Sequence, residues 1–297
     1  MEQELCEETC STAWLVHYFR LDFCSSLSLS LLLVAGFVVA LTRNLMLVAL
    51  QSTRRAVART AKYAPNFARR ALSTDGGADI VLNGEPVGPF QMNMFLVGCK
   101  KSGTAALVDS GATADEMTHF QHVLEENNLT VTHLLQTHAH IDHVLGLSVS
   151  RKLWPDAPIY LHEKDMPVYH NAATSAASYG IPMPGPLPED NIVHINEGDV
   201  INIGESISLN VLFTPGHCPG HVCYHDAKHK FLLGGDLIFA GSIGRTDLPL
   251  CNDQDMQASL RRVAKDIPGD TAIFPGHMQT TTMDHELATN PFLQFAE

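Results

Sequence analysis

The sequence predicts an α/β domain over residues 76–297, and three observations support this fold class. From Ile80 onward, short apolar runs alternate with turn residues, which is typical of β-strands. A helical pattern covers residues 114–127. Four of the apolar runs end just before residues that can bind metals, as expected when a rigid sheet carries a site in its loops. With 45% hydrophobic residues, the chain can bury a sizeable core.

Two strands and one helix are expected first in this domain. Asn93–Val97 and Ala105–Val108 are apolar runs that predict two strands of a meander. We expect the helix at Ala114–Asn127 to begin after Thr113, because a threonine side chain there can accept a hydrogen bond from the first helical turn. Glu116 follows three residues later and completes the pattern of a capping box.

The next predicted strand, residues 131–136, runs into a dense group of potential metal ligands. His138, His140, Asp142 and His143 lie within six residues of one another. Neutral imidazole and carboxylate groups are ligands that zinc and iron accept. Two histidines two positions apart can point to the same side and reach one ion, which leaves the other two residues for a second ion. The segment therefore predicts the start of a dinuclear metal site.

Three further strands repeat this arrangement, each with an apolar run, a few turn residues and one residue of ligand type. Those ligand-type residues are His217, Asp236 and His277. The remaining histidines lack this context, and we expect them to have surface or packing roles. They include His133, His162, His170, His194, His221 and His225.

The ligand pattern resembles that of the metallo-β-lactamase superfamily, and the resemblance covers residues 78–295. It implies a four-layer αβ/βα sandwich with the metal site at the strand ends. It also implies two divalent ions, with zinc favoured over iron, that are bridged by Asp236. The implied ligands are His138, His140 and His217 for the first ion, and Asp142, His143 and His277 for the second.

Within the superfamily, the chain resembles the short glyoxalase II-like hydrolases. Three strings carry this resemblance: residues 214–222, 241–249 and 288–293. It implies hydrolysis of a glutathione thioester such as S-D-lactoylglutathione by a metal-bound hydroxide, because paired cations lower the pKa of bound water. Asp142 and Asp236 would then be catalytic residues as well as ligands.

Arg245 and Asp247 follow Asp236 closely, so we expect both near the site. A salt bridge that orients the ligands is the favoured role, with direct substrate contact as the alternative. Other functions also stay open. A persulfide dioxygenase-like enzyme would use one iron held by His138, His217 and Asp236. A lactonase, a β-lactamase or a non-catalytic relative are further alternatives.

The net charge of the chain restricts the classes of binding partner that we expect. The whole chain has a formal net charge of −13, and residues 76–297 hold 26 acidic but only 11 basic residues. Nucleic-acid binding is not expected, because such binding depends on cationic contacts to phosphate. We expect a small-molecule thioester as the partner, and the oligomeric state is not indicated by the sequence.

Residues 1–75 predict either a targeting segment or a membrane anchor. Residues 23–42 are uncharged and largely apolar, enough to span a bilayer core of ~30 Å. Residues 43–70 hold seven basic and no acidic residues, which is typical of an organelle presequence such as a mitochondrial one. Targeting is the favoured interpretation. In the alternative, residues 23–42 cross a membrane and the basic flank leaves the catalytic domain in the cytosol.

Overall fold

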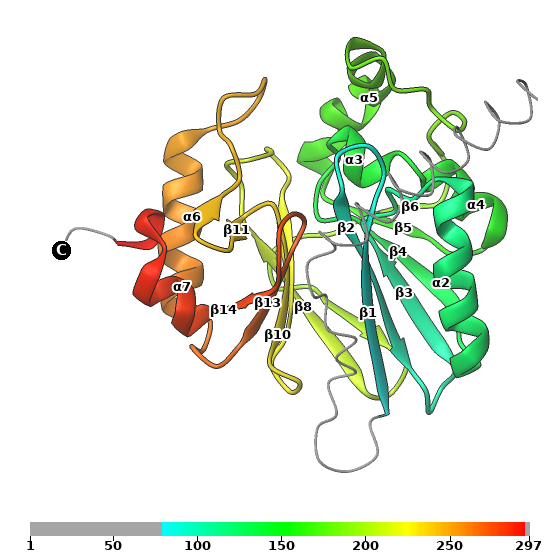
Figure 1. The fold of residues 1–297 in the computed structure, drawn as a ribbon, viewed down its shortest axis with the longest axis horizontal. Helices are drawn as coiled ribbons and strands as arrows, with labels where there is room; N and C mark the ends of the chain where they lie inside the picture. Colours follow the sequence, from blue (N-terminus) through cyan, green and yellow to red (C-terminus); the bar gives the residue numbers. More distant parts are fainter. Residues whose placement is uncertain (1–78, 295–297) are drawn as a thin grey trace, which may run out of the picture. The chain divides into compact units, whose positions relative to one another are not determined.

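Two six-stranded sheets form the centre of the fold in the computed structural model, which describes residues 79–294 (Figure 1). The first sheet has the order β1-β2-β3-β4-β5-β6. Its strands are β1 (Ile80–Val87), β2 (Met92–Cys99), β3 (Thr104–Val108), β4 (Thr130–Leu135), β5 (Ile159–Leu161) and β6 (Ile192–His194). The pairs β1–β2 and β2–β3 are antiparallel, and the remaining pairs of this sheet are parallel.

The second sheet has the order β14-β13-β10-β9-β8-β7. Its strands are β7 (Val200–Ile203), β8 (Ile207–Phe213), β9 (Val222–Asp226), β10 (Phe231–Gly235), β13 (Ala272–Pro275) and β14 (Thr281–Thr282). Only β10 and β13 pair in parallel. A short ribbon of β11 (Ile238–Phe239) and β12 (Ser242–Ile243) follows β10.

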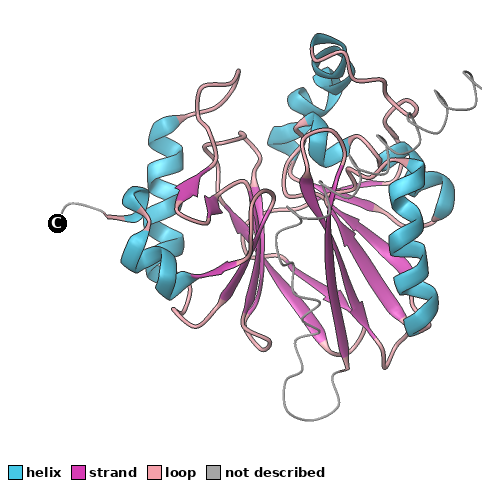
Figure 2. Ribbon diagram, viewed as in Figure 1, coloured by secondary structure: helices cyan, strands magenta, loops and turns pink. Residues whose placement is uncertain are grey.

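Helices cover the outer faces of both sheets (Figure 2). After the first three strands come α2 (Ala114–Asn127), α3 (Ile141–Val144), α4 (Leu147–Leu153), the 3-10 turn η1 (Glu163–Asp165) and α5 (Met166–Ser178). The second sheet is flanked by α6 (Asp253–Asp266), α7 (Met283–Thr289) and the 3-10 turn η2 (Pro291–Leu293). The four-layer α/β sandwich expected from the sequence is thus confirmed.

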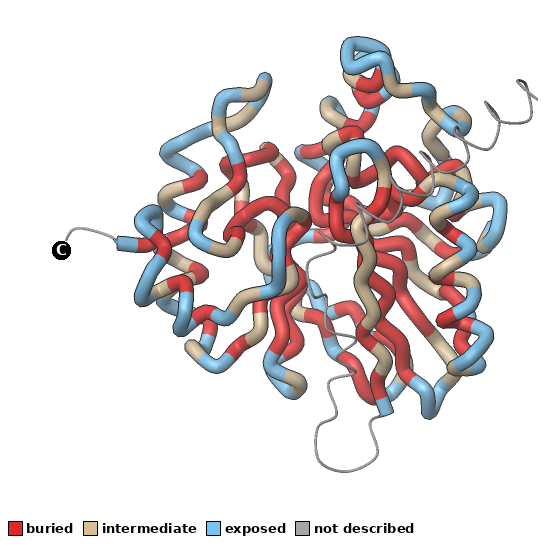
Figure 3. The backbone as a smooth tube through the Cα atoms, viewed as in Figure 1, coloured by how far each residue is buried: buried red, intermediate tan, exposed pale blue. Residues whose placement is uncertain are grey.

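Three hydrophobic clusters hold the layers together. In β2, Met92, Met94 and Leu96 pack in the cluster with α2, while Phe95 and Val97 belong to the cluster between the sheets. This alternation follows from the period of two residues in a strand. A third cluster packs α6 and α7 on the second sheet. Because both faces of each sheet are covered, the central strands β2, β9 and β10 are wholly buried, whereas edge strands such as β6 and β7 have exposed residues (Figure 3).

The local elements predicted from the sequence agree with the structure. Asn93–Val97 lies inside β2, and Ala105–Val108 lies inside β3. The helix α2 begins after Thr113, whose hydroxyl accepts from the backbone N–H of Glu116. The Glu116 carboxylate in turn accepts from the backbone N–H of Thr113 at 2.9 Å. The predicted capping box is therefore present.

The anchor and targeting interpretations concern residues 23–42 and 43–70, which lie outside the described residues. The predicted domain boundary near residue 76 also lies there. Among residues 79–294, no helix is long and apolar enough to cross a membrane.

Candidate metal centre

The seven predicted ligands meet at one edge of the sandwich. The segment after β4 carries His138 and His140, and α3 carries Asp142 and His143. The loops after β8, β10 and β13 carry His217, Asp236 and His277. Strands β8, β10 and β13 run in the same direction, so their C-terminal ends lie at the same edge of the second sheet. Sheet topology therefore gathers residues that are distant in the sequence.

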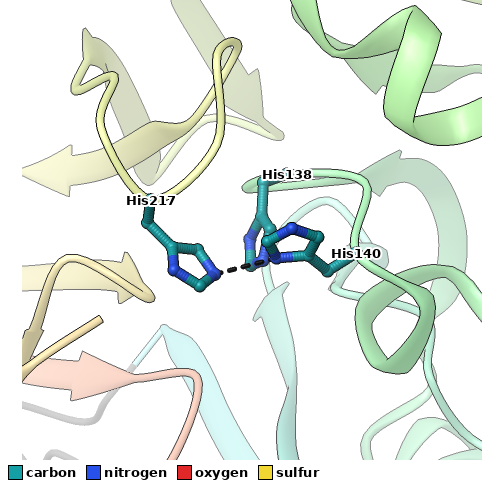
Figure 4. Close-up of side chains that lie close together, drawn as sticks. All are labelled: His138, His140 and His217. Atoms are coloured by element: carbon teal, nitrogen blue, oxygen red, sulfur yellow. Dashed lines mark hydrogen bonds between the residues drawn. The ribbon is translucent and has the colours of Figure 1, made fainter. Parts of the chain in front are cut away.

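The first ligand set consists of His138, His140 and His217, whose rings converge (Figure 4). The Nδ1 atom of His140 lies 2.8 Å from Nε2 of His217. The ring centroid of His138 lies 4.8 Å from that of His140 and 4.9 Å from that of His217. One nitrogen from each ring falls within 4.8 Å of the other two, a spacing that can surround one metal ion.

The second ligand set consists of Asp142, His143 and His277. The Oδ2 atom of Asp142 lies 3.0 Å from Nε2 of His277 and 3.7 Å from Nε2 of His143. His143 is fully buried, whereas the other two side chains are partly exposed. This set can hold a second ion with one open side.

Asp236 lies between the two sets. Its Oδ2 atom is 3.4 Å from Nε2 of His217 and 3.6 Å from Nε2 of His277. Its Oδ1 atom is 3.5 Å from Nε2 of His143. A single carboxylate that faces both sets has the geometry of a bridging ligand, as the resemblance implied.

Unpartnered polar atoms indicate that this cluster fits metal ions. The Nε2 atoms of His138 and His143 and the Oδ1 atom of Asp236 are buried and have no hydrogen-bond partner among the described residues. Most buried side-chain polar atoms in native proteins have at least one partner. Bound cations would satisfy these atoms, and imidazole nitrogen with carboxylate oxygen is a donor set that zinc and iron accept. The residues present therefore fit two metal ions.

The two sets differ in their electrostatics. Burial lowers the pKa of His138 well below its usual value and the pKa of His140 to about 3. Burial also opposes the charged form of His143, but nearby carboxylates, Asp142 foremost, raise its pKa well above the usual value. For Asp236, the positive charge of His143 outweighs burial and lowers the pKa of the carboxyl. The first set thus presents neutral imidazoles, the form that binds metals.

Asp109 contacts both Thr137 and His143, a member of the second ligand set. Its carboxylate accepts from the Thr137 backbone N–H at 2.7 Å and from the Thr137 hydroxyl at 2.8 Å. The Oδ2 atom also lies 3.0 Å from Nδ1 of His143. A carboxylate on the far nitrogen of a ligand imidazole orients the ring and fixes its tautomer. The Nε2 atom of His143 is therefore left to face the site.

Asp165 joins the two loops that carry the first set, and the sequence analysis did not identify it. Its carboxylate accepts from the backbone N–H of Ala139 at 2.7 Å and from the backbone N–H of Gly220. Its side chain is fully buried, and this burial raises the pKa of the carboxyl to about 6. Ala139 separates two ligand histidines, so Asp165 holds their loop against the loop of His217.

His221 has a contact that the expected packing role did not include. Its Nε2 atom accepts from the backbone N–H of Asp236 at 3.0 Å. Its Nδ1 atom therefore carries the proton and donates to the hydroxyl of Thr214 at 2.8 Å. Burial lowers the pKa of His221 to about 3, which keeps the ring neutral. His221 thus fixes the backbone that presents Asp236.

Arg245 and Asp247 form the predicted salt bridge, but this salt bridge lies at an exposed position. The guanidinium donates from Nε to Oδ1 at 2.6 Å and from Nη2 to Oδ2 at 2.8 Å of Asp247. Both side chains are more than half exposed. A ligand is instead oriented by the backbone carbonyl of Arg245, which accepts from Nδ1 of His217 at 2.8 Å. The sequence pattern showed the pair but not this backbone contact.

The candidate metal ligands border a pocket with a volume of about 340 Å³. Five of the seven ligands line it, together with Arg245 from the loop after β12. Those five ligands are His140, Asp142, His217, Asp236 and His277. Small-molecule sites in proteins have volumes of ~300–1,000 Å³, so this pocket can hold a small substrate beside the ions.

Comparisons with known proteins agree with this geometry. A family model of the metallo-beta-lactamase superfamily matches residues 87–277. The hydroxyacylglutathione hydrolase GloC of Haemophilus influenzae is 31% identical over 209 residues, which cover 70% of this chain and 95% of that protein. The probable metallo-hydrolase YqgX of Bacillus subtilis is 34% identical over 211 residues, with coverages of 70% and 95%.

A solved structure shares the fold. The crystal structure of TTHA1623 in a di-iron-bound form matches with a TM-score of 0.63 and 34% sequence identity. The match covers 71% of this chain and 100% of that chain. The two-sheet fold, the clustered ligands and the matched family model together show that this chain belongs to the metallo-β-lactamase superfamily and is similar to its glyoxalase II-like hydrolases.

Proposed function

We propose that this protein is a metal-dependent thioester hydrolase that cleaves a glutathione thioester such as S-D-lactoylglutathione. The observation that carries the proposal is the pair of ligand sets that share Asp236 beside a pocket of substrate size. Similarity to the hydroxyacylglutathione hydrolase GloC supports the substrate class. The histidine-rich donor set favours zinc, with iron as the second candidate.

Residues of this chain would position the metal ions and the substrate. Two divalent ions in this site would lower the pKa of water and polarise a thioester carbonyl. The imidazoles of His140 and His217 line the pocket, and Asp165 and the carbonyl of Arg245 hold the loops that carry them. The carboxylate of Asp236 faces both sets from one buried position. Asp142 lies on the open side, where it lines the pocket with His277.

Metal analysis combined with a thioester assay tests this proposal. We expect the purified full-length protein to bind two equivalents of metal and to release free thiol from S-D-lactoylglutathione. Asp236→Asn should lose bound metal and lower kcat about 100-fold or more, since even outer-shell changes cost ~10–100-fold. Asp270→Asn is the matched control, because Asp270 pairs with Lys230 at an exposed site.

Three other results would each contradict the proposal. Protein that binds two equivalents of metal yet leaves the thioester intact would exclude this activity. Oxygen consumption with glutathione persulfide would indicate the mononuclear iron alternative, with His138, His217 and Asp236 as ligands. Hydrolysis of a lactone or a β-lactam in preference to thioesters would indicate another hydrolase of the superfamily.

A further inference from the structure

A second pocket adjoins the metal site. Its volume is about 410 Å³, and we call it the α5 compartment because α5 supplies much of its wall. It shares lining residues with the metal pocket, so the two spaces have part of their walls in common. The shared residues are His140, Ile141, Ser175, Tyr179 and Leu248. A substrate whose reactive carbonyl lies at the metals can therefore extend one arm into the α5 compartment.

Among the described residues 79–294, no lysine, arginine, aspartate or glutamate lines the α5 compartment. Its wall includes Val168, Ala172, Pro249 and Leu250, with small hydroxyl side chains between them. Among the residues that the structure describes, Arg245 is the only lysine or arginine that lines either pocket, and it lines the metal pocket alone. The two spaces thus differ in their lining: the metal pocket has the guanidinium of Arg245, which pairs with Asp247, and the carboxylates of Asp142 and Asp236, whereas the described lining of the α5 compartment has none of these charged groups.

Exposed apolar side chains line both pockets. Eight large hydrophobic residues are exposed among those that the structure describes, and four of them line these two pockets. The four are Phe90, Tyr179, Leu250 and Met278, and we call them the apolar rim. Exposed apolar residues that gather at one place mark binding surfaces more often than scattered ones do. The rim therefore indicates an apolar ligand at this edge.

The backbone supports a functional role for the rim. Leu250 and Met278 have φ angles of 68° and 67°, in the left-handed region that favours glycine. They are the only large apolar residues with positive φ in the described part of the chain. Such conformations cost energy and gather at ligand sites, where they aim a side chain. Phe90 and Tyr179 also meet edge to face, with ring centroids 5.3 Å apart, and so join the β1–β2 turn to the end of α5.

We propose that the α5 compartment binds the acyl group of the substrate and that the preferred acyl group is an apolar chain. This inference rests on the proposed thioester hydrolysis. A glutathione carrier bears charged groups, so it matches the side of the metal pocket, where charged side chains lie, and not a compartment whose described lining has no lysine, arginine, aspartate or glutamate. The acyl group then occupies the α5 compartment. A lactoyl group is small and hydroxylated, and it leaves most of that apolar surface uncovered, whereas a linear acyl chain covers it.

Steady-state kinetics of the full-length, metal-loaded protein test the proposal. The substrates are the acetyl, butyryl, hexanoyl and D-lactoyl thioesters of glutathione. We expect kcat/KM to rise up to about fourfold for each added methylene until the compartment is filled, because that is the gain from burying one methylene. Hexanoylglutathione should therefore exceed D-lactoylglutathione at least tenfold.

Single substitutions test whether the α5 compartment causes the preference for a longer acyl chain. Leu250→Ala should raise KM for the hexanoyl substrate about tenfold, as expected for several lost methylene contacts, and change the D-lactoyl substrate less than twofold. Leu153→Ala is the matched control, because Leu153 is also exposed but lines neither pocket. Ser178→Trp, at an exposed position that lines only the α5 compartment, should block the hexanoyl chain and spare the D-lactoyl group.

The outcomes separate this inference from the proposed function. If no thioester is cleaved, the proposed function itself fails. If thioesters are cleaved but D-lactoylglutathione is preferred, and Leu250→Ala behaves like Leu153→Ala, the acyl-chain inference is overturned. If Leu250→Ala leaves the kinetics of all substrates unchanged but alters the molecular mass in solution, the rim is an interface between copies and the inference is also wrong.

Discussion

Replacement of Asp165 by asparagine tests a residue that holds the ligand loops in place but is not itself a candidate metal ligand. Each carboxylate oxygen of Asp165 accepts one backbone N–H, one from Ala139 and one from Gly220. Asparagine offers only one acceptor oxygen in that geometry, so its amide NH₂ must face one of these N–H groups. One buried donor then loses its partner, although no metal ligand has been changed.

The structure sets the size of the expected effect. A buried donor left without a partner costs ~1–3 kcal/mol, and a lost bond to a charged acceptor is in the same range. We therefore expect Asp165→Asn to destabilise the protein by about 2 kcal/mol at pH 8, where a carboxyl of pKa about 6 is ionised. In a domain of this size, such a loss lowers Tm by roughly 4–8 °C. Loosening both loops should weaken metal affinity about 10–100-fold.

Competition with a chromophoric chelator measures the metal affinity, and thermal unfolding of the metal-free protein measures the stability. Asp156→Asn, at an exposed position, is the matched control. The reasoning would be refuted if Asp165→Asn kept the metal affinity of the control. A fall in Tm with unchanged metal affinity would show that Asp165 contributes to folding but does not position the first ligand set.

Two further predictions follow from the supporting residues and from the first 75 residues. His221→Phe should cost ~1–3 kcal/mol in urea unfolding at pH 7, because the backbone N–H of Asp236 loses its acceptor. The folded pKa of His221 is about 3 against 6.5 in the unfolded chain, so the unfolded state binds more protons between these values and stability falls as the pH drops below 6.5. That fall should be shallower in His221→Phe, and an unchanged slope would contradict the assignment. Sequencing the mature N-terminus of the protein from cells should find it near residue 75 if residues 1–75 are a presequence, whereas full-length protein in carbonate-washed membranes would establish the anchor.

Local sequence patterns were enough for much of the fold. Continuous apolar runs in β2 and β3 are buried on both faces, and the Thr113–Glu116 capping box starts α2 where predicted. Such signals are local, because strand alternation and helix capping depend on residues only a few positions apart. The seven ligands were also identifiable from the sequence, since each follows an apolar run. The assignment of His217, Asp236 and His277 came from the family resemblance. The structure places His217 with His138 and His140, His277 with Asp142 and His143, and Asp236 with His138 and His143.

The sequence alone determined the α/β class, the ligand residues and the acidic character of the domain. Only the tertiary structure decided how those ligands are held. Asp165 meets Gly220 across 55 positions, and Asp109 meets Thr137 across 28. No short-range pattern specifies such pairs, because they depend on how two sheets pack and which loops then meet. The same packing places Phe90, Tyr179 and Met278 of the apolar rim at the metal pocket.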